Sequence, residues 1–365
     1  MSTKSPVICQ IVQHLAPGGI ETMVLDLQHK ASIPEQVHII SLEGSYEEAV
    51  AHWPRIKDVP RLHFLGKQPG LKPQTVKDLA TLLRKLGIDV IHTHHVGPLL
   101  YGGFAAKLAS CKHVHTEHDA WHLSNFKRRF LVGACFHLLR PSVAADAKLV
   151  AQNIRQHIPL FKPSVVFNGI DTSRFCPADQ HQARNQLGLP DKVRIIGCAA
   201  RFTAVKSHDI LIKAFAGLPE NNHLSLAGNG ELESCLKALV YKLGIAHRVH
   251  FLDVVHDMPA FYQAIDIFCM ASEREGLPLS PLEAQACGRV VVLTDVGGCR
   301  EAVDPNSGLL VPHGNTEQLS QALGQQLQNG LHPDASNSAR QFVLEHGDLS
   351  RMINQYEQLY RGKSL

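Results

Sequence analysis

The sequence has no long hydrophobic run and no recognisable disulfide framework. No stretch approaches the roughly 18 apolar residues that a membrane-spanning helix needs, and residues 1–19 lack the apolar core and cleavage site of a signal peptide. The nine cysteines are an odd number and include no CxxC pair, which is typical of a reduced, intracellular protein. We therefore expect a cytoplasmic protein, with any membrane contact being peripheral.

The sequence also lacks a strong excess of charge of either sign. A net charge of +3 and a pI near 8.3 are too small to indicate nucleic-acid binding, which usually needs a clustered basic face on a strongly basic domain. Acidic residues are, however, missing from residues 120–145, where Lys127, Arg128, Arg129 and Arg140 stand among hydrophobic residues. Residues 126–140 could lie on an anionic membrane surface or form a core helix with a basic edge, and both interpretations stay open.

The length of 365 residues is more than twice that of a usual domain, which predicts two cores of roughly 170 residues each. Hydrophobic residues at 44% and charged residues at 19% are ordinary values for a globular protein. There is no low-complexity tract or short-period repeat. A two-domain protein with a cleft between its halves is the expected result.

Short apolar runs alternate with helical periods along the whole chain, which indicates parallel sheets with helices on both faces. In the first half we predict strands at 7–12, 37–41 and 89–92, and a helix near 76–86 that ends at Gly87. After a turn at 168–171 the pattern restarts. There we predict strands at 193–198, 224–227, 249–252, 265–270 and 290–294, and helices at 210–215, 231–243 and 282–287. A last amphipathic helix is predicted to carry Leu349, Met352, Ile353, Tyr356, Leu359 and Tyr360.

In two such doubly wound domains, a ligand is expected in the crevice at the carboxyl ends of the strands. Residues 271–288 follow a predicted strand and run into a predicted helix, and they contain Glu275 and Glu283, separated by seven residues. We expect Glu275 in the loop and Glu283 in about the first turn of the helix, where Pro281 is suited to an early position. The free backbone N–H groups of such a turn attract anions, although a Glu there can also serve only to compensate the helix dipole.

The segment 271–288 resembles the E-x7-E signature of the retaining glycosyltransferases of family 4, also called group 1. The resemblance extends over nearly the whole chain and implies the GT-B architecture, an α/β fold of two Rossmann-like domains that face a central cleft. It implies an acceptor domain at 1–170, a nucleotide-sugar donor domain at 171–345, and a C-terminal helix at 346–365 that packs back toward the first domain. The segment Asn168 to Phe175 matches the interdomain segment of the family.

In this family the first Glu contacts the donor sugar and the second binds the ribose, so the resemblance implies these roles for Glu275 and Glu283. Loop amides between them also reach the sugar, which adds Gly276, Leu277, Pro278 and Leu279 to the expected donor site. The family more usually has Phe-Gly where this chain has Leu277-Pro278. Because proline has no N–H to donate, one of those amide contacts is in question, and the identity of the sugar with it.

Other segments resemble further parts of the family's donor site. Arg201 and Lys206 match an Arg-x4-Lys loop that holds the diphosphate, where two cations can stabilise the leaving group without a metal. The turn at 228–231 is also present in the family. Gly18 and Gly19 match a Gly-Gly-x-Glu element that faces the donor phosphates, and paired glycines permit close approach of the backbone.

Histidines are abundant after two predicted strands of the first half. His118 resembles the family's histidine near the donor sugar and acceptor, where an imidazole can orient a hydroxyl or stabilise charge. Alternatively, His113, His115 and His118 resemble the HxHxDH ligands of metallo-β-lactamase-like hydrolases. Against a metal site, alternate residues of a strand point to opposite faces, no further zinc-ligand run is evident, and the second half would have no explanation.

The resemblance implies transfer of a sugar from a nucleoside diphosphate to a hydroxyl, with retention and without a cofactor or metal. Catalytic contributions are expected from His118, Arg201, Lys206 and Glu275. UDP is the commonest carrier in the family, and GDP stays open. The expected acceptor is a glycan or lipid-linked molecule in polysaccharide or glycoconjugate biosynthesis, contacted by loops such as 101–103 and 120–126. The alternatives are the metal hydrolase and a non-enzymatic descendant that binds sugar without turnover.

Overall fold

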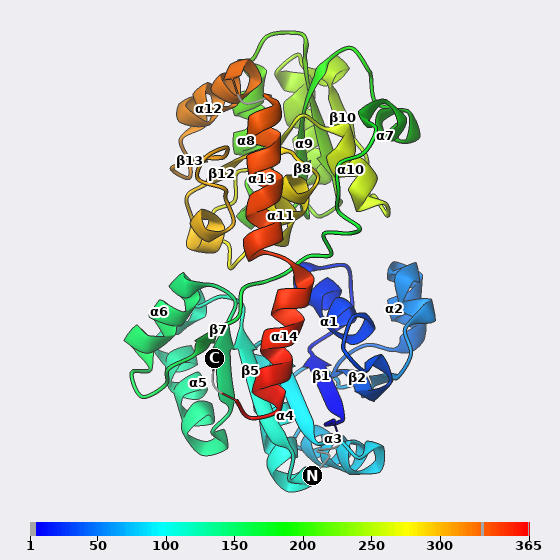
Figure 1. Ribbon diagram of the computed structural model, residues 1–365, viewed down its shortest axis with the longest axis vertical. Coiled ribbons are helices and arrows are strands. Elements are labelled where there is room, and N and C mark those ends of the chain that lie inside the picture. The colour runs from blue at the N-terminus through cyan, green and yellow to red at the C-terminus, as the bar shows by residue number, and fades with distance from the viewer. Residues whose placement is uncertain (1–4, 330–331, 364) are drawn as a thin grey trace. The chain divides into compact units, whose positions relative to one another are not determined.

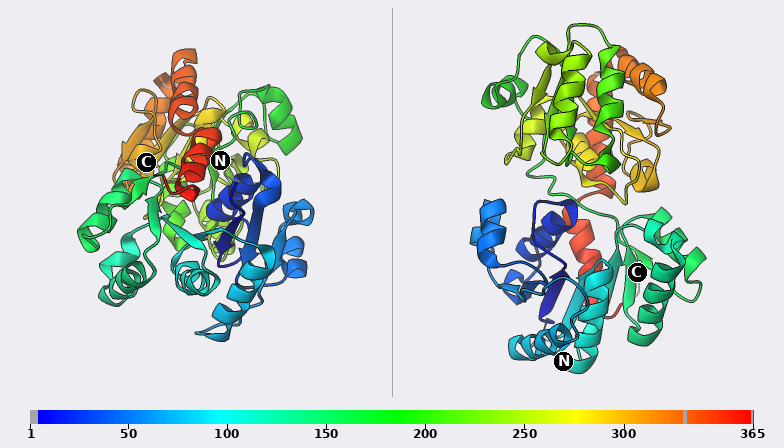
Figure 2. Two further views of the ribbon diagram at one scale, coloured as in Figure 1. Left: turned by 60° about the horizontal axis from the view of Figure 1, so that its bottom comes forward. Right: turned by 180° about the vertical axis from the view of Figure 1, so that it is seen from behind.

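The computed structural model describes residues 5–329, 332–363 and 365, and it divides into two compact units. The first unit comprises residues 1–168 and 350–365, and the second comprises residues 169–349. Each unit has one parallel sheet with helices on both faces (Figures 1 and 2). The predicted α/β class with two doubly wound domains is therefore confirmed.

The first unit contains a seven-stranded sheet in the order β3-β2-β1-β4-β5-β6-β7. The strands are β1 (Ile8–Val12), β2 (Val37–Ser41), β3 (Leu62–Phe64), β4 (Val90–His94), β5 (Lys112–Glu117), β6 (Ser142–Ala145) and β7 (Ser164–Val165). The helices are α1 (Gly19–His29), α2 (Tyr46–His52), α3 (Gln74–Leu86), α4 (Val96–Ala109), α5 (Phe126–Leu139), α6 (Lys148–His157) and α14 (Leu349–Tyr360), with short 3-10 turns η1 (Pro34–Gln36), η2 (Pro54–Asp58) and η3 (Trp121–Ser124).

The second unit contains a six-stranded sheet in the order β10-β9-β8-β11-β12-β13. The strands are β8 (Arg194–Ala199), β9 (Asn222–Ala227), β10 (Val249–Phe251), β11 (Ile267–Met270), β12 (Val290–Thr294) and β13 (Leu309–Val311). The helices are α7 (Gln180–Leu187), α8 (His208–Ala216), α9 (Glu233–Lys242), α10 (Met258–Ala264), α11 (Leu279–Ala286), α12 (Thr316–Asn329) and α13 (Pro333–His346), with 3-10 turns η4 (Ala204–Lys206), η5 (Ala246–Arg248) and η6 (Gly297–Glu301).

In each sheet the order of the strands reverses direction at one point, between β1 and β4 in the first unit and between β8 and β11 in the second. All strand pairs are parallel, so the loops after these strands open at one edge of each sheet. Ligands of doubly wound folds bind at such points. The loops that follow β8 and β11 carry Arg201, Lys206 and Glu275.

Alternation along the strands of the first unit separates two kinds of side chain. Cys9, Ile11 and Ile91 pack into a hydrophobic cluster with residues of α3 and α4. Gln10 and His92, whose side chains point to the opposite face, contact Tyr360 of α14. The helix that ends the chain therefore covers a polar face of this sheet, as Figure 1 shows for α14 in red.

Candidate functional site

Two of the predicted donor-site residues, Lys206 and Glu275, form an ion pair. Lys206 ends η4 after β8, and its ammonium lies 2.5 Å from a carboxylate oxygen of Glu275 in the loop after β11. The side chains are 20% and 10% exposed, respectively. The backbone N–H of Glu273 also donates to the carbonyl of Val205 at 2.8 Å. The loops after β8 and β11 thus contact each other at the switch point of the sheet, through one ion pair and one backbone hydrogen bond.

Arg201 is exposed and lies on the same loop as Lys206. The backbone of this loop is hydrogen-bonded to the turn at 228–231 and the residue after it. The N–H of Phe202 donates to the carbonyl of Asn229 at 2.8 Å, and the N–H of Leu232 donates to the carbonyl of Phe202 at 3.0 Å. Gly230 has a φ of +157° and lies so close to Phe202 that a Cβ would meet its backbone at 2.6 Å. The glycine turn therefore shapes the loop that carries Arg201.

Glu283 lies in α11 as its fifth residue, slightly deeper in the helix than the sequence predicted. The difference arises because Pro278 has an extended backbone and serves as N-cap, so that the helix begins at Leu279. One carboxylate oxygen of Glu283 accepts a hydrogen bond of 2.6 Å from the hydroxyl of Tyr262 in α10. Burial, reinforced by the charge of Glu283, raises the pKa of the Tyr262 phenol well above its usual value. Tyr262 therefore stays a donor and orients Glu283.

A Gly-Gly step at the start of η6 shapes the loop that carries Glu275. Gly297 has a φ of +53°, and a Cβ there would overlap the backbone carbonyl of Glu275. The N–H of Gly298 donates to the carbonyl of Gly276 at 2.8 Å. Sequence reasoning missed Gly297, Gly298 and Tyr262. The two glycines had a signal, because they follow a predicted strand, whereas Tyr262 had none beyond its helical position.

The other residues of the expected donor loop occupy the connection from β11 to α11. Leu277 and Pro278 are buried, and Gly276 and Leu279 are half-buried. Pro278 presents no N–H, and Pro281 lies within the first turn of α11. The free amides at the beginning of the helix are therefore those of Leu279 and Ser280.

Burial also suppresses charge on His208, the first residue of α8 after the Lys206 loop. Burial, followed by the positive charge of Lys206, lowers the pKa of His208 to about 4. His208 follows Ser207, whose hydroxyl lies 3.2 Å from Nε2 of His313. At neutral pH His208 therefore adds no charge to that of Arg201 and Lys206.

The remaining predicted residues belong to the first unit. Gly18 is the N-cap of α1 and Gly19 its first residue. The carboxylate of Glu21 folds back so far that a Cβ on Gly18 would overlap it. Glu21 also lies 3.8 Å from Nε2 of His14. A side chain at Gly18 would therefore displace the carboxylate of Glu21 from its position in this turn.

His118, which follows β5, is buried and has a partner at each ring nitrogen. Its Nε2 lies 3.0 Å from Nδ1 of His94, and its Nδ1 lies 3.4 Å from a carboxylate oxygen of Asp146. Asn168 donates to that same oxygen at 3.2 Å. Sequence reasoning named His118 but missed His94 and Asp146, which are contributed by the ends of the neighbouring strands.

His113 and His115 lie on the opposite face of β5 from Thr116, where they share the hydroxyl of Thr93 at 2.8 and 2.9 Å. Burial, followed by the charge of His115, lowers the pKa of His113 to about 3. Within the described residues, no three His, Cys, Asp or Glu side chains are grouped so that they could hold a metal ion. The geometry therefore gives no support to the metal-hydrolase alternative.

Family models match both halves of the chain. The model described as glycosyl transferases group 1 matches residues 179–342, and the model described as glycosyltransferase family 4 matches residues 17–174. Among curated proteins, the chain is 28% identical over 362 residues to a GDP-mannose-dependent monoacylated alpha-(1-6)-phosphatidylinositol monomannoside mannosyltransferase of Corynebacterium glutamicum, covering 90% of each chain. It is 31% identical over 371 residues to a D-inositol 3-phosphate glycosyltransferase of Salinispora tropica, covering 91% of this chain and 74% of that protein.

A solved structure shares the fold over nearly the full length. The crystal structure of Anabaena Alr3699/HepE in complex with UDP and glucose matches with a TM-score of 0.84 at 21% identity, covering 97% of this chain and 99% of that chain. At this identity the likeness concerns the arrangement of the backbone. It places the two parallel sheets among those of known GT-B proteins.

Proposed function

The chain belongs to glycosyltransferase family 4 of the group 1 glycosyl transferases, and from this premise we propose what it transfers and how its residues act. It is a retaining glycosyltransferase. In our proposal it moves a sugar from a nucleoside-diphosphate sugar to a hydroxyl of a glycan or lipid-linked acceptor. The pairing of Lys206 with Glu275 at 2.5 Å is the observation that carries the proposal.

Arg201 and Lys206 hold the diphosphate in this proposal. The leaving nucleoside diphosphate gains negative charge as the glycosidic bond breaks, and two nearby cations stabilise that charge. The free amides at the start of α11 add a second anion-attracting element to the same loops. No metal or other cofactor is needed for this charge balance.

Glu275 and Glu283 bind hydroxyl groups of the donor. A carboxylate accepts hydrogen bonds from two hydroxyls at once, and such charge-assisted bonds are roughly twice as strong as neutral ones. The hydroxyl of Tyr262 occupies one oxygen of Glu283 and fixes its orientation toward the ribose. Glu275 acts at the sugar, with backbone groups of Gly276, Leu277 and Leu279. His118 acts at the sugar or the acceptor, and Gly18 and Gly19 approach the donor phosphates.

We propose UDP as the nucleotide carrier and a GDP-sugar as the alternative. UDP is the nucleotide in the Anabaena HepE complex, and the name of the Corynebacterium relative specifies GDP-mannose. The acceptor would belong to polysaccharide or glycoconjugate assembly in the cytoplasm. No helix in the described part of the chain is long and apolar enough to cross a membrane.

Calorimetric titration with UDP, GDP and their common sugar conjugates, with EDTA present throughout, tests the donor site. We expect one nucleotide to bind in the micromolar range and Arg201→Ala to lose most of that affinity. Arg194→Ala is the matched control, because Arg194 begins β8 at the end opposite to Arg201 and its side chain is 53% exposed. Absence of binding by every nucleotide would contradict the proposed donor site.

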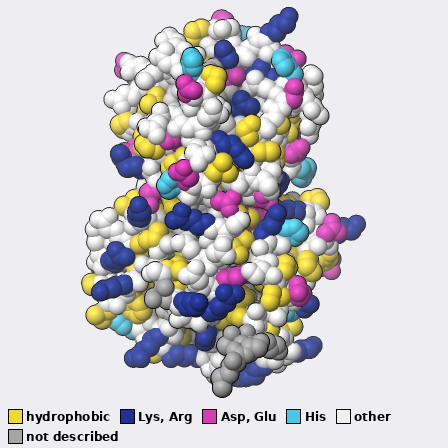
Figure 3. Space-filling view, in the orientation of Figure 1, with side chains coloured by type: hydrophobic (Ala, Val, Ile, Leu, Met, Phe, Trp, Pro, Cys, Tyr) yellow, Lys and Arg dark blue, Asp and Glu magenta, His cyan; other side chains and the backbone are white. Residues whose placement is uncertain are grey.

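The patch formed by α5 and residues 157–160 is proposed as a peripheral membrane contact. Phe126, Phe130 and Leu160 are 69%, 71% and 79% exposed and line one shallow groove, next to Lys127, Arg128 and Arg129. Figure 3 shows hydrophobic and basic side chains side by side on the first unit. Apolar side chains among cations favour the surface of an anionic bilayer.

Co-sedimentation with vesicles of anionic phospholipid at low and high salt tests this contact. We expect binding at low salt that Leu160→Ser weakens. Leu71→Ser is the matched control, because Leu71 is 74% exposed but lies in the loop before α3. Failure to bind at low salt would remove the proposed membrane contact and leave the donor site untouched.

A further inference from the structure

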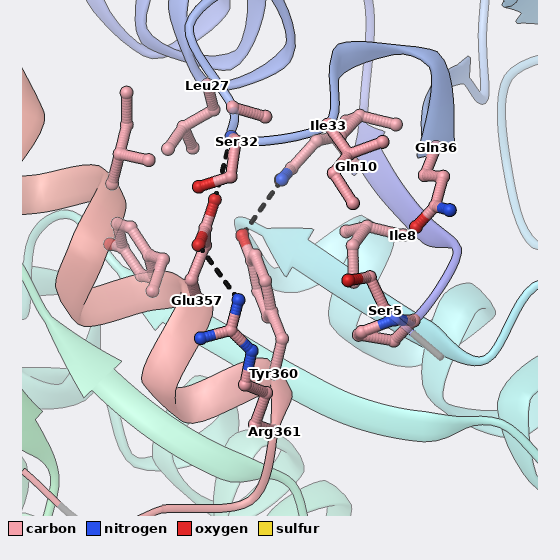
Figure 4. Close-up of a pocket in the computed structure, with 15 residues that line it drawn as sticks. Ser5, Ile8, Gln10, Leu27, Ser32, Ile33, Gln36, Glu357, Tyr360 and Arg361 are labelled. Atoms are coloured by element: carbon pink, nitrogen blue, oxygen red, sulfur yellow. Dashed lines mark hydrogen bonds and ion pairs between the residues drawn. The ribbon is translucent and has the colours of Figure 1, made fainter. Parts of the chain in front are cut away.

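A continuous chain of buried hydrogen bonds connects α14 to His118 within the first unit. Figure 4 shows one of its links, where the Tyr360 hydroxyl faces the amide of Gln10 at the edge of a pocket. The chain begins at Tyr356, whose Oη lies 3.0 Å from Thr116 Oγ1, and Thr116 Oγ1 lies 2.7 Å from His92 Nε2. Tyr360 Oη then lies 2.9 Å from His92 Nδ1 and 2.9 Å from Gln10 Nε2. Gln10 Oε1 lies 2.9 Å from His94 Nε2, and His94 Nδ1 lies 3.0 Å from His118 Nε2.

The amide of Gln10 determines the position of the proton on His94. Its nitrogen donates to Tyr360, so its oxygen faces Nε2 of His94 and must accept a hydrogen there. Burial, followed by the charges of neighbouring histidines, lowers the pKa of His94 well below its usual value. His94 therefore carries one proton only, on Nε2, and its Nδ1 is an acceptor. The hydrogen between His94 and His118 must come from His118.

The opposite nitrogen of His118 faces a carboxylate. Asp146 is 1% exposed, and one of its oxygens lies 3.4 Å from His118 Nδ1. A bare nitrogen lone pair directed at a carboxylate would be repelled, whereas an N–H would be attracted. Because Nε2 already carries a proton for His94, a proton on Nδ1 makes the ring an imidazolium.

We propose that Gln10, oriented by Tyr360 of α14, is a positioning residue that holds His118 as a cationic imidazolium beside Asp146. If the amide were rotated by 180°, its nitrogen would donate to His94. His94 would then donate to His118, and a neutral His118 with one proton on Nδ1 would satisfy Asp146. The orientation of one amide thus selects between a charged and a neutral His118.

Several titratable groups act on His118 and belong to the same balance. His92, His94 and His95 come from β4 and the residue after it, Glu117 comes from β5, and Asp146 follows β6. Burial keeps His92, His94 and His95 neutral by lowering their pKa values. The acidic members of the set are Glu117 and Asp146.

The consequence for catalysis rests on the proposed function, in which His118 acts at the sugar or the acceptor. An imidazolium has no free lone pair and cannot serve as a general base. Its contribution would be its positive charge, which favours the negative charge that develops on the leaving diphosphate. The protonation state itself does not depend on that function and can be measured separately.

Proton–nitrogen correlation spectra of the histidine rings in the full-length protein measure this state directly. His118→Gln identifies the signals of His118. We expect protons on both nitrogens of His118 and on Nε2 only of His94 at neutral pH. A neutral His118 in the unaltered protein would overturn the proposal.

Two substitutions at Gln10 test its part in the chain. Gln10→Met removes the acceptor for His94 with little change of shape, and we expect His118 then to carry a proton on Nδ1 only. Gln10→Glu retains an acceptor toward His94 and should keep His118 doubly protonated. Tyr356→Phe removes a buried hydroxyl at the far end of the chain and should leave His118 unchanged. The same two ring protons on His118 in Gln10→Met and in the unaltered protein would refute the positioning role.

Turnover of the variants separates this proposal from the proposed function. If His118 acts through its charge, turnover at neutral pH falls in Gln10→Met and not in Gln10→Glu. If the spectra show the expected protons but His118→Gln retains full turnover, the hydrogen-bond chain stands and the catalytic role of His118 is wrong.

Discussion

Replacement of Glu275 by glutamine should separate the nucleotide from the sugar in the donor site. Glu275 lies 2.5 Å from the Lys206 ammonium, and both side chains are mostly buried. If Lys206 holds the diphosphate, the carboxylate competes with the phosphates for the same cation and repels them. Glutamine has the same shape without the charge, so Glu275→Gln should bind UDP or GDP at least as tightly as the unaltered protein.

The size of this gain follows from Coulomb's law. A carboxylate roughly 6 Å from a phosphate charge, at an effective dielectric constant of about 50, repels it by about 1 kcal/mol, or about fivefold in Kd. Lys206→Met removes a charge-assisted bond worth about 1.5–3 kcal/mol, which predicts nucleotide binding about 10- to 150-fold weaker. Both variants should lose turnover with the sugar nucleotide, because Glu275 also holds the sugar and Lys206 stabilises the charge of the leaving diphosphate.

Calorimetric titration with the nucleoside diphosphate at two salt concentrations is the appropriate assay, together with thermal unfolding of each variant. The double variant of Lys206→Met and Glu275→Gln completes the cycle, because the two residues are in contact and their effects should not add. If Glu275→Gln weakens nucleotide binding as much as Lys206→Met does, the competition argument is refuted. Glu275 would then support the diphosphate site.

Three further predictions concern the scaffold. Arg248 is 2% exposed and donates to backbone carbonyls within residues 216–222. Arg248→Met should therefore destabilise the protein by about 3 kcal/mol in denaturant unfolding. A change in the free energy of unfolding under about 1 kcal/mol would contradict this account. Gly297 has a φ of +53°, so Gly297→Ala should lower the free energy of unfolding by at least about 1 kcal/mol and also lower turnover. Unchanged unfolding and turnover would show that the loop adapts. Burial, followed by the charge of His63, lowers the pKa of His38 to about 4 in the folded protein. The contribution of neutral His38 to stability is therefore present above pH 6.5 and is lost as pH falls from 6.5 toward 4. Thermal unfolding of His38→Gln should show a weaker pH dependence over that window.

Several elements could be predicted closely from local pattern. The predicted strands at 37–41 and 290–294 match β2 and β12 at both ends, and the apolar positions predicted for the last helix, from Leu349 to Tyr360, lie in α14. Gly87 ends α3 in a left-handed conformation, as its position after a helical period indicated. These elements have strong periodicity and clear turn residues at their ends, so local physics determines them.

Other boundaries depended on contacts that no local pattern reveals. β11 begins at Ile267, two residues later than predicted. The preceding Asp266 accepts hydrogen bonds from the N–H of Ile195 and from Arg184, which gives it a role as an anchor between segments. Such a role requires partners about 70 and 80 residues away, and their arrival depends on the packing of the whole unit.

For the candidate site, the sequence alone indicated which loops carry the predicted donor-site residues. The residue types and spacing of Arg201 and Lys206, and of Glu275 and Glu283, placed two charged loops after buried strands, because strand periodicity and turn chemistry are local properties. Only the tertiary structure decided which of these groups meet. Lys206 contacts Glu275 across 69 residues of chain, and Gln10 contacts Tyr360 across 350. Strand order and register bring such side chains together, and they are set by the packing of entire sheets and helices.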